Sequence, residues 1–412
     1  MDFIREKTKE KPMSRRKLWT KIGFAALCGL VFASVVVIVI LLCMPMLQDR
    51  LILSTEDTEN ETQNQVETEV TEHTESEAEL VIPPNFSLSI SDYQTLQDEL
   101  YRIGNTVNKS IVTVMTLSGE NDEWMNNPFE AEGQSSGIIV AEDENYLYVL
   151  TEKKAIADAD AIRIAFVDHT GAEAKILKYD GNTGLSVLTV EKRLVAQNTK
   201  VRIAVAALGS SYEMSNGSIV IALGSPLGTN YSILTGNITS VQNEIATKDK
   251  NYSVFTTDIV ASAHASGVLA NTKGEIVGIV MQSLSGSQDM NTLTVVTMDE
   301  LKDMIEVLCN GKDLPYMGVY ISTVTKDISK DYDIPVGVYI KDIVSDSPAM
   351  RAGLQSGDVI VGINGESIVT DVVFSNKISQ LIPGTTCEVM VKRQNGNEYY
   401  DLSCMVEIGV LK

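Results

Sequence analysis

The chain has 412 residues, of which 44% are hydrophobic and 21% charged, a composition that excludes disorder throughout. Its formal net charge of −22 disfavours binding to nucleic acid, whose backbone would repel it. Five cysteines are too few for a disulfide-rich scaffold, and three histidines leave little scope for His-based metal sites, so we expect no metal and no cofactor. Because one core rarely exceeds about 250–300 residues, the length predicts two or three folded units.

The first 47 residues have the pattern of a membrane anchor. Residues 1–21 carry eight Lys or Arg against three acidic residues, and residues 22–47 contain no charged side chain. About 20 apolar residues are enough to cross the hydrocarbon core of a bilayer. We therefore predict one uncleaved membrane-spanning helix at 22–47. Its basic flank places residues 1–21 in the cytoplasm and the folded domains outside it.

Residues 48–95 differ sharply in composition from what precedes and follows them. The stretch 56–79 holds ten acidic residues and no Lys or Arg. Such a segment has too little apolar surface to offset the entropy lost on folding, and its like charges repel one another. We predict a disordered, extended stalk over residues 48–95.

Residues 96–310 contain short apolar, β-rich runs separated by Gly, Asn and Asp. We expect strands at 110–117, 137–142, 146–151, 161–168, 185–191, 218–224, 232–242 and 275–282. Many strands with few helices indicate a mainly β domain, either an antiparallel barrel or a pair of packed sheets. A helix expected over 298–312 closes this unit.

Residues 313–412 form a second, smaller unit. Short helices are expected near 348–352 and over 372–384, and strands over 387–393 and 398–407. The last two strands flank an Asn-Gly dipeptide, which favours a two-residue hairpin turn.

A turn at Asn395 and Gly396 would place Cys387 opposite Cys404. They would form a non-hydrogen-bonded pair, in which Cα atoms lie about 4.5 Å apart, within the range of a disulfide. The alternative is that both are reduced cysteines on one apolar face of the hairpin.

The stretch SPAMRAGLQSGDVIVGINGESI, residues 347–368, resembles the SPA-x-x-AGL-x-x-GD-x-I-x-x-ING-x-x-I pattern of PDZ domains. The unit before it then resembles the HtrA/Deg family of trypsin-like serine proteases, whose members place a two-barrel protease before a PDZ domain. The resemblance covers roughly residues 100–410 in the order of the family. It implies a mainly β chain, with a trypsin-like double β-barrel over 96–310 and a PDZ domain over 313–412.

A trypsin-like protease needs a nucleophilic serine, a histidine base, a carboxylate that orients the base, and N–H donors for the oxyanion. The segment TDIVASAHASGVLAN, residues 257–271, resembles the family's nucleophile segment and places Ser266 at the nucleophile. It places His264 where the family has the glycine of the oxyanion hole. Because a Cβ restricts the backbone there, we expect His264 to damage the hole.

The other two members of the triad are missing from the matching motifs. LTEKKAI, residues 150–156, places Lys154 where the family has its histidine, and TGLSVL, residues 183–188, places Gly184 where the family has its aspartate. The resemblance therefore implies a pseudoprotease.

No other residue is expected to replace the base. Lys154 would need a desolvated pocket to lose its proton near neutral pH. His264 is only two residues from Ser266 and would lack an orienting carboxylate. His169 is expected in a turn after a strand, and His73 in the stalk.

PDZ domains bind an extended C-terminal peptide by strand addition and hold its carboxylate with loop N–H groups. The resemblance assigns that loop to Tyr316, Met317, Gly318 and Val319. Gly318 would let the backbone turn its N–H groups towards an anion. Phe374 and Ile378 are candidate pocket residues on the expected helix, and packing within the domain core is the alternative for both.

Two main hypotheses for function follow. The first is a membrane-anchored pseudoprotease of the bacterial cell envelope that binds C-terminal or unfolded peptides, as a scaffold, chaperone or regulator in protein quality control. The resemblance also implies homo-trimers, or hetero-trimers with HtrA/Deg-like paralogues. The alternative is a divergent serine endopeptidase that uses Ser266. A third option is a surface protein whose PDZ domain has no ligand.

Overall fold

The computed structural model describes residues 89–117, 135–157, 159, 161–285, 291–396 and 398–411. Four predicted features lie wholly or mostly outside them: the basic tail (1–21), the membrane span (22–47), the stalk (48–95) and His73. Within the described ranges, no helix is long and apolar enough to cross a membrane.

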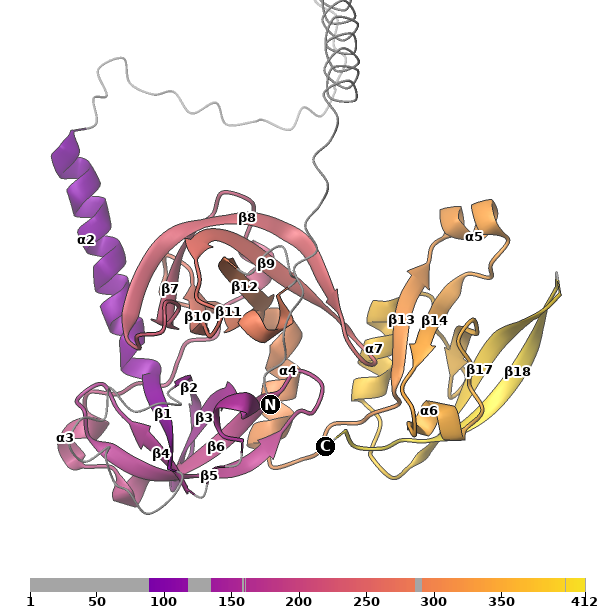
Figure 1. Ribbon diagram of the computed structural model, residues 1–412, viewed down its shortest axis with the longest axis horizontal. Helices are drawn as coiled ribbons and strands as arrows, with labels where there is room; N and C mark the ends of the chain where they lie inside the picture. Colours follow the sequence, from indigo (N-terminus) through magenta and orange to yellow (C-terminus); the bar gives the residue numbers. More distant parts are fainter. Residues whose placement is uncertain are drawn as a thin grey trace, which may run out of the picture. The chain divides into compact units, whose positions relative to one another are not determined.

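Two closed antiparallel barrels follow one another along the chain, which confirms the predicted double β-barrel (Figure 1). In order around the first barrel the strands are β1 (Ile111–Leu117), β2 (Ser135–Glu142), β3 (Tyr146–Glu152), β6 (Leu185–Glu191), β5 (Gly171–Tyr179) and β4 (Ala161–Ala165). Around the second they are β10 (Ser266–Ala270), β11 (Ile276–Met281), β12 (Thr292–Thr297), β9 (Asn251–Val260), β8 (Ser232–Ala246) and β7 (Ile219–Ser225).

Each barrel is filled by its own apolar core, because alternate residues of a strand point to the same side. The first barrel encloses a cluster that includes Val112, Ile139, Val149, Ile164 and Leu188. The second encloses a cluster that includes Ala222, Phe255, Leu269, Val280 and Val295. Apolar side chains, many of them β-branched, therefore fill the barrels, whose strands are joined by backbone hydrogen bonds.

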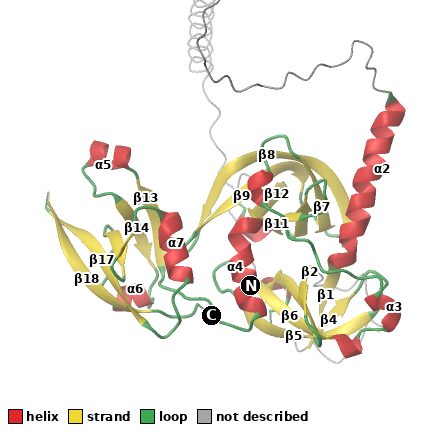
Figure 2. Cartoon of the chain, turned by 180° about the vertical axis from the view of Figure 1, so that it is seen from behind, coloured by secondary structure: helices red, strands yellow, loops and turns green. Residues whose placement is uncertain are grey.

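Helix α4 (Met298–Cys309) lies between the two barrels in both ribbon views (Figures 1 and 2). Its Leu301 and Leu308 are fully buried in one cluster with Leu185 of β6. The helix predicted over 298–312 is confirmed, and Gly311, with φ 67°, lies just beyond its end. The remaining short helices of this domain are η2 (Asn108–Ser110), η4 (Lys153–Ala155), η5 (Lys192–Leu194), α3 (Gln197–Lys200), η6 (Ser211–Glu213) and η7 (Gln282–Leu284).

Helix α2 (Ile90–Val107) begins inside the segment predicted as a stalk, so the predicted end of the stalk at residue 95 is wrong. Ser89 and Asp92 form a capping box that fixes the start of the helix: Ser89 N donates to Asp92 Oδ2 at 2.8 Å, and Asp92 N to Ser89 Oγ at 3.3 Å. Further along, Gly104 lets the helix approach β8, because a Cβ there would lie 2.8 Å from Ile233 Cγ2.

A separate sheet follows the barrels within the predicted PDZ unit. Its strands, in spatial order, are β13 (Val319–Val324), β14 (Gly337–Ile343), β15 (Val359–Ile363), β17 (Thr386–Asn395) and β18 (Glu398–Glu407), with β16 (Glu366–Ser367) on β15. Its helices are α5 (Lys326–Tyr332), α6 (Pro348–Arg351) and α7 (Asp371–Ser379), of which the last two were expected. This order leaves β13 at an edge of the sheet, the position from which a PDZ domain pairs with a peptide.

The β17–β18 hairpin has a different register from the one predicted. Asn395 pairs with Glu398, and Cys387 pairs with Val406. The predicted pairing of Cys387 with Cys404 is wrong, because the turn lies one residue later along the chain than expected. Both cysteines are free and buried in the core of this unit, as in the alternative of two reduced cysteines on one face.

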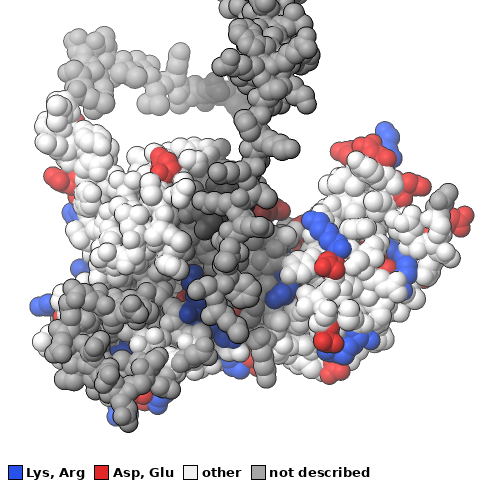
Figure 3. Space-filling model, in the orientation of Figure 1, with Lys and Arg blue, Asp and Glu red and all other residues white. Residues whose placement is uncertain are grey.

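The surface of the described domains carries both signs of charge. On the face in Figure 3, acidic and basic side chains are interspersed and neither forms a continuous patch. Ion pairs such as Lys178–Asp313 and Lys392–Asp401, both 2.7 Å, lie at the surface. Pairs of this kind contribute about 0–1 kcal/mol each, so the apolar cores supply most of the stability.

Candidate functional site

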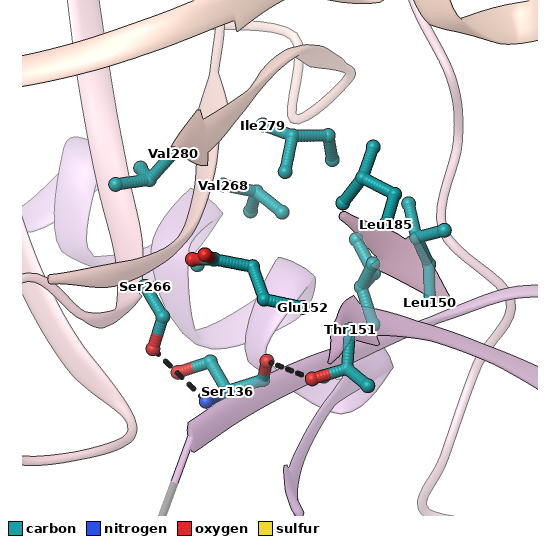
Figure 4. Close-up of a pocket in the computed structure, with 12 residues that line it drawn as sticks. Ser136, Leu150, Thr151, Glu152, Leu185, Ser266, Val268, Ile279 and Val280 are labelled. Atoms are coloured by element: carbon teal, nitrogen blue, oxygen red, sulfur yellow. Dashed lines mark hydrogen bonds between the residues drawn. The ribbon is translucent and has the colours of Figure 1, made fainter. Parts of the chain in front are cut away.

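Ser266, at the predicted nucleophile position, is the first residue of β10 and is 4% exposed. It pairs with Ser225 of β7 on one side and with Met281 of β11 on the other. Its Oγ accepts a hydrogen bond of 3.0 Å from the backbone N–H of Ser136 in β2 (Figure 4). The hydroxyl therefore faces the first barrel. Its partner there is a backbone N–H, which donates a hydrogen bond and cannot accept the hydroxyl proton.

A small cavity of about 20 Å³ adjoins Ser266 and is lined from both barrels. Much of its wall is apolar and comes from Leu150, Leu185, Val268 and Ile279 (Figure 4). This volume has room for one water molecule and none for the scissile peptide group of a substrate.

Lys154, at the predicted base position, lies in η4. Its Nζ is 2.7 Å from Oε2 of Glu152, and the side chains are 45% and 7% exposed, respectively. The ammonium is thus paired with a carboxylate and half in solvent. A Ser–Lys dyad needs a desolvated lysine close to the serine, and Lys154 does not meet that requirement.

Glu152 is a site residue that the motif comparison missed. Its side chain lines the same cavity as Ser266 (Figure 4), and its Oε2 also accepts a hydrogen bond of 3.3 Å from Ser283 Oγ. Its Oε1 is buried and has no hydrogen-bond partner among the described residues. The signal was an acidic residue within LTEKKAI, at the end of an otherwise apolar strand.

Gly184, at the position of the missing carboxylate, ends a tight turn. The turn begins at Asp180, whose carboxylate accepts hydrogen bonds from the N–H groups of Asn182 (3.0 Å) and Thr183 (2.8 Å). Gly184 has φ 77°, and its carbonyl accepts a hydrogen bond of 2.6 Å from the N–H of Lys153. In the left-handed region only glycine, asparagine and aspartate are common, so this turn disfavours most other residues at position 184.

His264 lies in an exposed turn before β10. It is not among the non-glycine residues with a positive φ, so its backbone does not take up the conformations that glycine alone adopts readily. The adjacent N–H of Ala265 donates to Ser262 O at 3.0 Å within the same turn. His169 also lies in a turn, with φ 65°, as expected. The Ser266 hydroxyl is thus bonded to a backbone amide and to neither imidazole.

The predicted carboxylate-binding loop directs its N–H groups at one acceptor, the carboxylate of Asp249 in the turn between β8 and β9. Met317 N donates to Oδ2 at 2.7 Å, and Gly318 N and Val319 N donate to Oδ1 at 2.8 and 2.9 Å. Gly318 has φ 94°, and a Cβ there would lie 2.4 Å from the Cβ of Ser347. Only glycine fits, and it produces the concave loop that the sequence predicted.

Asp249 is buried, and burial raises the pKa of its carboxyl group to about 6, although the hydrogen bonds from the loop lower it. Motif comparison did not find this residue. Its turn, Thr247–Lys250, lies outside the motifs that carry the resemblance, and its partners are 68 to 70 residues further along the chain.

The remaining predicted PDZ residues lie at the start of the loop or in the core of the unit. Tyr316 is bonded to Gly409 in both directions, at 3.0 and 2.9 Å, and burial, followed by the nearby Asp249 carboxylate, raises the pKa of its hydroxyl to about 12. Phe374 is fully buried and Ile378 is 3% exposed, and both pack in the core of the unit. Ile378 also lines a cavity of about 500 Å³ that borders Asp249 and Tyr316.

Two family models match the chain: the trypsin-like peptidase domain over residues 135–279 and the PDZ domain over residues 315–403. The chain is 32% identical over 275 residues to a probable periplasmic serine endoprotease DegP-like of Ectopseudomonas mendocina, covering 65% of this chain and 56% of that protein. It is 31% identical over 291 residues to a protein of the same description from Hahella chejuensis, covering 69% and 58%. The chain thus spans little more than half the length of these relatives.

Solved structures show the same fold at lower identity. An HtrA-type protease, AlgW, with a decapeptide matches with a TM-score of 0.52 and 19% identity, covering 75% of this chain and 98% of that one. A serine endoprotease from Yersinia pestis matches with a TM-score of 0.50 and 22% identity over the same shares. With two trypsin-like barrels running directly into a PDZ sheet, and with DegP-like relatives, this chain belongs to the HtrA family.

Proposed function

We propose that this chain is an HtrA-family pseudoprotease that binds peptides through its PDZ domain and serves as a scaffold, chaperone or regulator in envelope protein quality control. Ser266 carries the proposal. Its hydroxyl is bonded to the N–H of Ser136, and no imidazole or amine among the described residues is bonded to it. A serine hydroxyl is a weak nucleophile until a base takes its proton.

The three other positions matched to the catalytic motif support the same conclusion, because none of their residues does what the family's residue does. Lys154 forms an ion pair, Gly184 closes a turn, and His264 is exposed. Loss of triad members lowers the rate by orders of magnitude, and the catalysis that survives depends on the oxyanion hole and on substrate binding. Here the cavity at Ser266 is too small to admit a substrate.

The cellular setting is part of the proposal. Relatives are described as periplasmic, which supports an extracytoplasmic position for both folded domains. The apolar segment 22–47 would anchor the chain with its N-terminus in the cytoplasm. Resemblance to the family also supports a homo-trimer or a hetero-trimer with active paralogues. Protease digestion of intact cells, followed by detection of the PDZ unit, tests the topology, and light scattering of the detergent-solubilised chain tests the assembly.

The catalytic proposal is tested with the purified full-length chain, casein and quenched fluorescent peptides. We expect the wild type to show no turnover above that of Ser266→Ala. The triple variant Lys154→His, Gly184→Asp, His264→Gly should also stay inactive, because the cavity beside Ser266 holds only about 20 Å³ and the Ser266 hydroxyl stays bonded to the N–H of Ser136. Turnover by the wild type that Ser266→Ala abolishes would overturn the proposal.

The alternative of a divergent serine endopeptidase rests on one observation, the buried and unpartnered Oε1 of Glu152 beside the cavity of Ser266. A carboxylate in that place could accept a proton if the cavity opened. Activity of this kind would be lost in Glu152→Gln as well as in Ser266→Ala.

A further inference from the structure

The loop that binds a peptide carboxylate in PDZ domains already holds a carboxylate in this chain. The three N–H groups of Met317, Gly318 and Val319 are bonded to Asp249. The backbone N–H of Asp249 also donates to Val319 O at 2.7 Å. A peptide adding to the free edge of β13 would use these same donors for its terminal carboxylate and the same carbonyl for its last N–H. Asp249 therefore occupies the place of a C-terminal residue.

The turn that carries Asp249 also contacts the opposite wall of the groove, helix α7. Ser375 Oγ donates to the backbone carbonyl of Asp249 at 2.9 Å. Asn251 Nδ2 donates to Asp371 Oδ2 at 2.8 Å, and Thr323 Oγ1 of β13 donates to Asp371 Oδ1 at 2.7 Å. The turn thus bridges β13 and α7, the two elements between which a peptide would lie.

The protease-like domain holds this turn in shape. Asn182 of the first barrel donates through Nδ2 to Thr247 Oγ1 at 2.9 Å and to Lys248 O at 2.8 Å. Its Oδ1 accepts a hydrogen bond of 3.2 Å from Lys248 N. Asn182 belongs to the tight turn that ends at Gly184. The turn at the position of the family's catalytic aspartate therefore supports the segment that occupies the PDZ loop.

We propose that Asp249 is an internal ligand of the PDZ domain, and that a peptide with a free C-terminal carboxylate binds only by displacing the turn Thr247–Lys250. The proposal rests on the peptide-binding function proposed above. The two occupants exclude each other because both would need the same three N–H donors, and a second carboxylate would add a like charge at a buried site. Because only chains with Asp249 undocked can bind peptide, the apparent affinity equals the intrinsic affinity multiplied by the undocked fraction.

The neighbouring cavity indicates what the last side chain of the displacing peptide would be. The cavity of about 500 Å³ beside Asp249 has apolar wall residues, namely Met304, Val307, Leu314 and Ile378. The cavity is also lined by charged side chains, among them Lys248, Lys250 and Glu300, and a peptide ending in valine probes its apolar part.

Two substitutions remove the internal ligand without disturbing the turn. Asp249 has φ 61°, which glycine and asparagine tolerate, so Asp249→Gly deletes the carboxylate and Asp249→Asn neutralises it. Asn also turns an amide donor towards the loop's N–H groups. The matched control is Asp303→Asn, since Asp303 is an exposed carboxylate on the wall of the same cavity and does not bond to the loop.

Binding is measured by fluorescence anisotropy on the full-length chain, with a labelled peptide ending in valine and the same peptide carrying a C-terminal amide. We expect Asp249→Gly and Asp249→Asn to bind the free-acid peptide about tenfold or more tighter than the wild type or Asp303→Asn. Affinity for the amide should not change. Hydrogen exchange at residues 317–319 provides a second measurement, with protection in the wild type, its loss in both Asp249 variants and its return on adding the free-acid peptide.

Three other outcomes are possible, and each contradicts a different part of the proposal. Equal binding by the wild type and the Asp249 variants, with unchanged exchange, would overturn the internal ligand and leave peptide binding standing. An equal gain for acid and amide peptides would overturn the role of the carboxylate. Binding by none of the chains would overturn both the peptide-binding function and the competition.

Discussion

The Oγ of Ser266 accepts a hydrogen bond of 3.0 Å from the N–H of Ser136, and both residues are buried. The bond joins β10 of the second barrel to β2 of the first. Ser136 Oγ donates in turn to Asn230 Oδ1 at 2.6 Å, which extends the link into the loop before β8. The residue at the nucleophile position thus connects the two barrels.

Ser266→Ala should therefore affect stability rather than activity. The substitution leaves a buried N–H at Ser136 without its partner, at a cost of about 1–3 kcal/mol in the free energy of unfolding. Urea unfolding of the full-length chain measures it. The control is Ser403→Ala, an exposed hydroxyl, which should change the value by less than about 0.5 kcal/mol. Equal effects of the two substitutions would contradict the structural role.

Lys154 and Glu152 should be coupled energetically. Lys154→Met leaves the buried Glu152 carboxylate without its ion pair and should lower the free energy of unfolding by about 1–2 kcal/mol. This is less than for a fully buried pair, because the Lys154 side chain is 45% exposed.

A double-mutant cycle with Glu152→Gln provides the measurement. The double variant should lose less stability than the sum of the single variants, because a neutral side chain needs no counter-charge. Strict additivity would show that the pair does not stabilise the fold.

Gly318→Ala should damage both the stability of the PDZ unit and its loop. The new Cβ would lie 2.4 Å from the Cβ of Ser347, at a residue with φ 94°. We expect a loss of about 2–4 kcal/mol and of binding to C-terminal peptides. Gly353→Ala separates backbone strain from the close contact, because Gly353 has φ 84° and open space around it. This variant should lose only about 1 kcal/mol in the free energy of unfolding and should still bind peptide. Matching losses would show that backbone strain, rather than the close contact, makes glycine necessary at 318.

Docking of Asp249 should weaken as pH rises. Burial raises the pKa of this carboxyl group from 3.8 to about 6, so the docked state binds the extra proton between these values. Its contribution to stability is fully present below about pH 3.8 and is lost as the pH rises through about 6. Lys248, Tyr252 and Tyr316 face the group, and the pKa of Tyr316, raised to about 12, lies outside this window.

The measurement is the difference in the free energy of unfolding between the wild type and Asp249→Asn from pH 4 to pH 7. The wild type should lose about 1–3 kcal/mol relative to the variant over this range. A difference that does not vary with pH would contradict the buried, titrating carboxyl group.

Local patterns in the sequence predicted many of the strands, and the resemblance to the HtrA/Deg family predicted the two barrels. The predicted strand 185–191 matches β6 at both ends. Its first residue, Leu185, comes directly after the turn that ends at Gly184. The start of α2 was missed because the acidic composition before it outweighed the capping box of Ser89 and Asp92. The register of the last hairpin was missed because moving a turn by one residue changes every partner in both strands.

The contacts on which the proposals rest join distant parts of the chain. Glu152 lies within a recognisable motif, yet its burial beside Ser266 follows from how the two barrels meet. Asp249 lies in a turn of charged residues, and its role depends on a loop in the other domain. Residue types and spacings along the chain do not by themselves reveal such contacts.

The bridge between Tyr316 and Gly409 ties the binding loop to residues made late in translation. The Asp249 turn and its barrel precede Gly409 along the chain and are made first, and domains generally fold as units. The loop therefore takes its final form when the turn that fills it is already in place. If Asp249 docks as proposed, a newly made chain would therefore close the loop on the Asp249 turn as the PDZ unit folds.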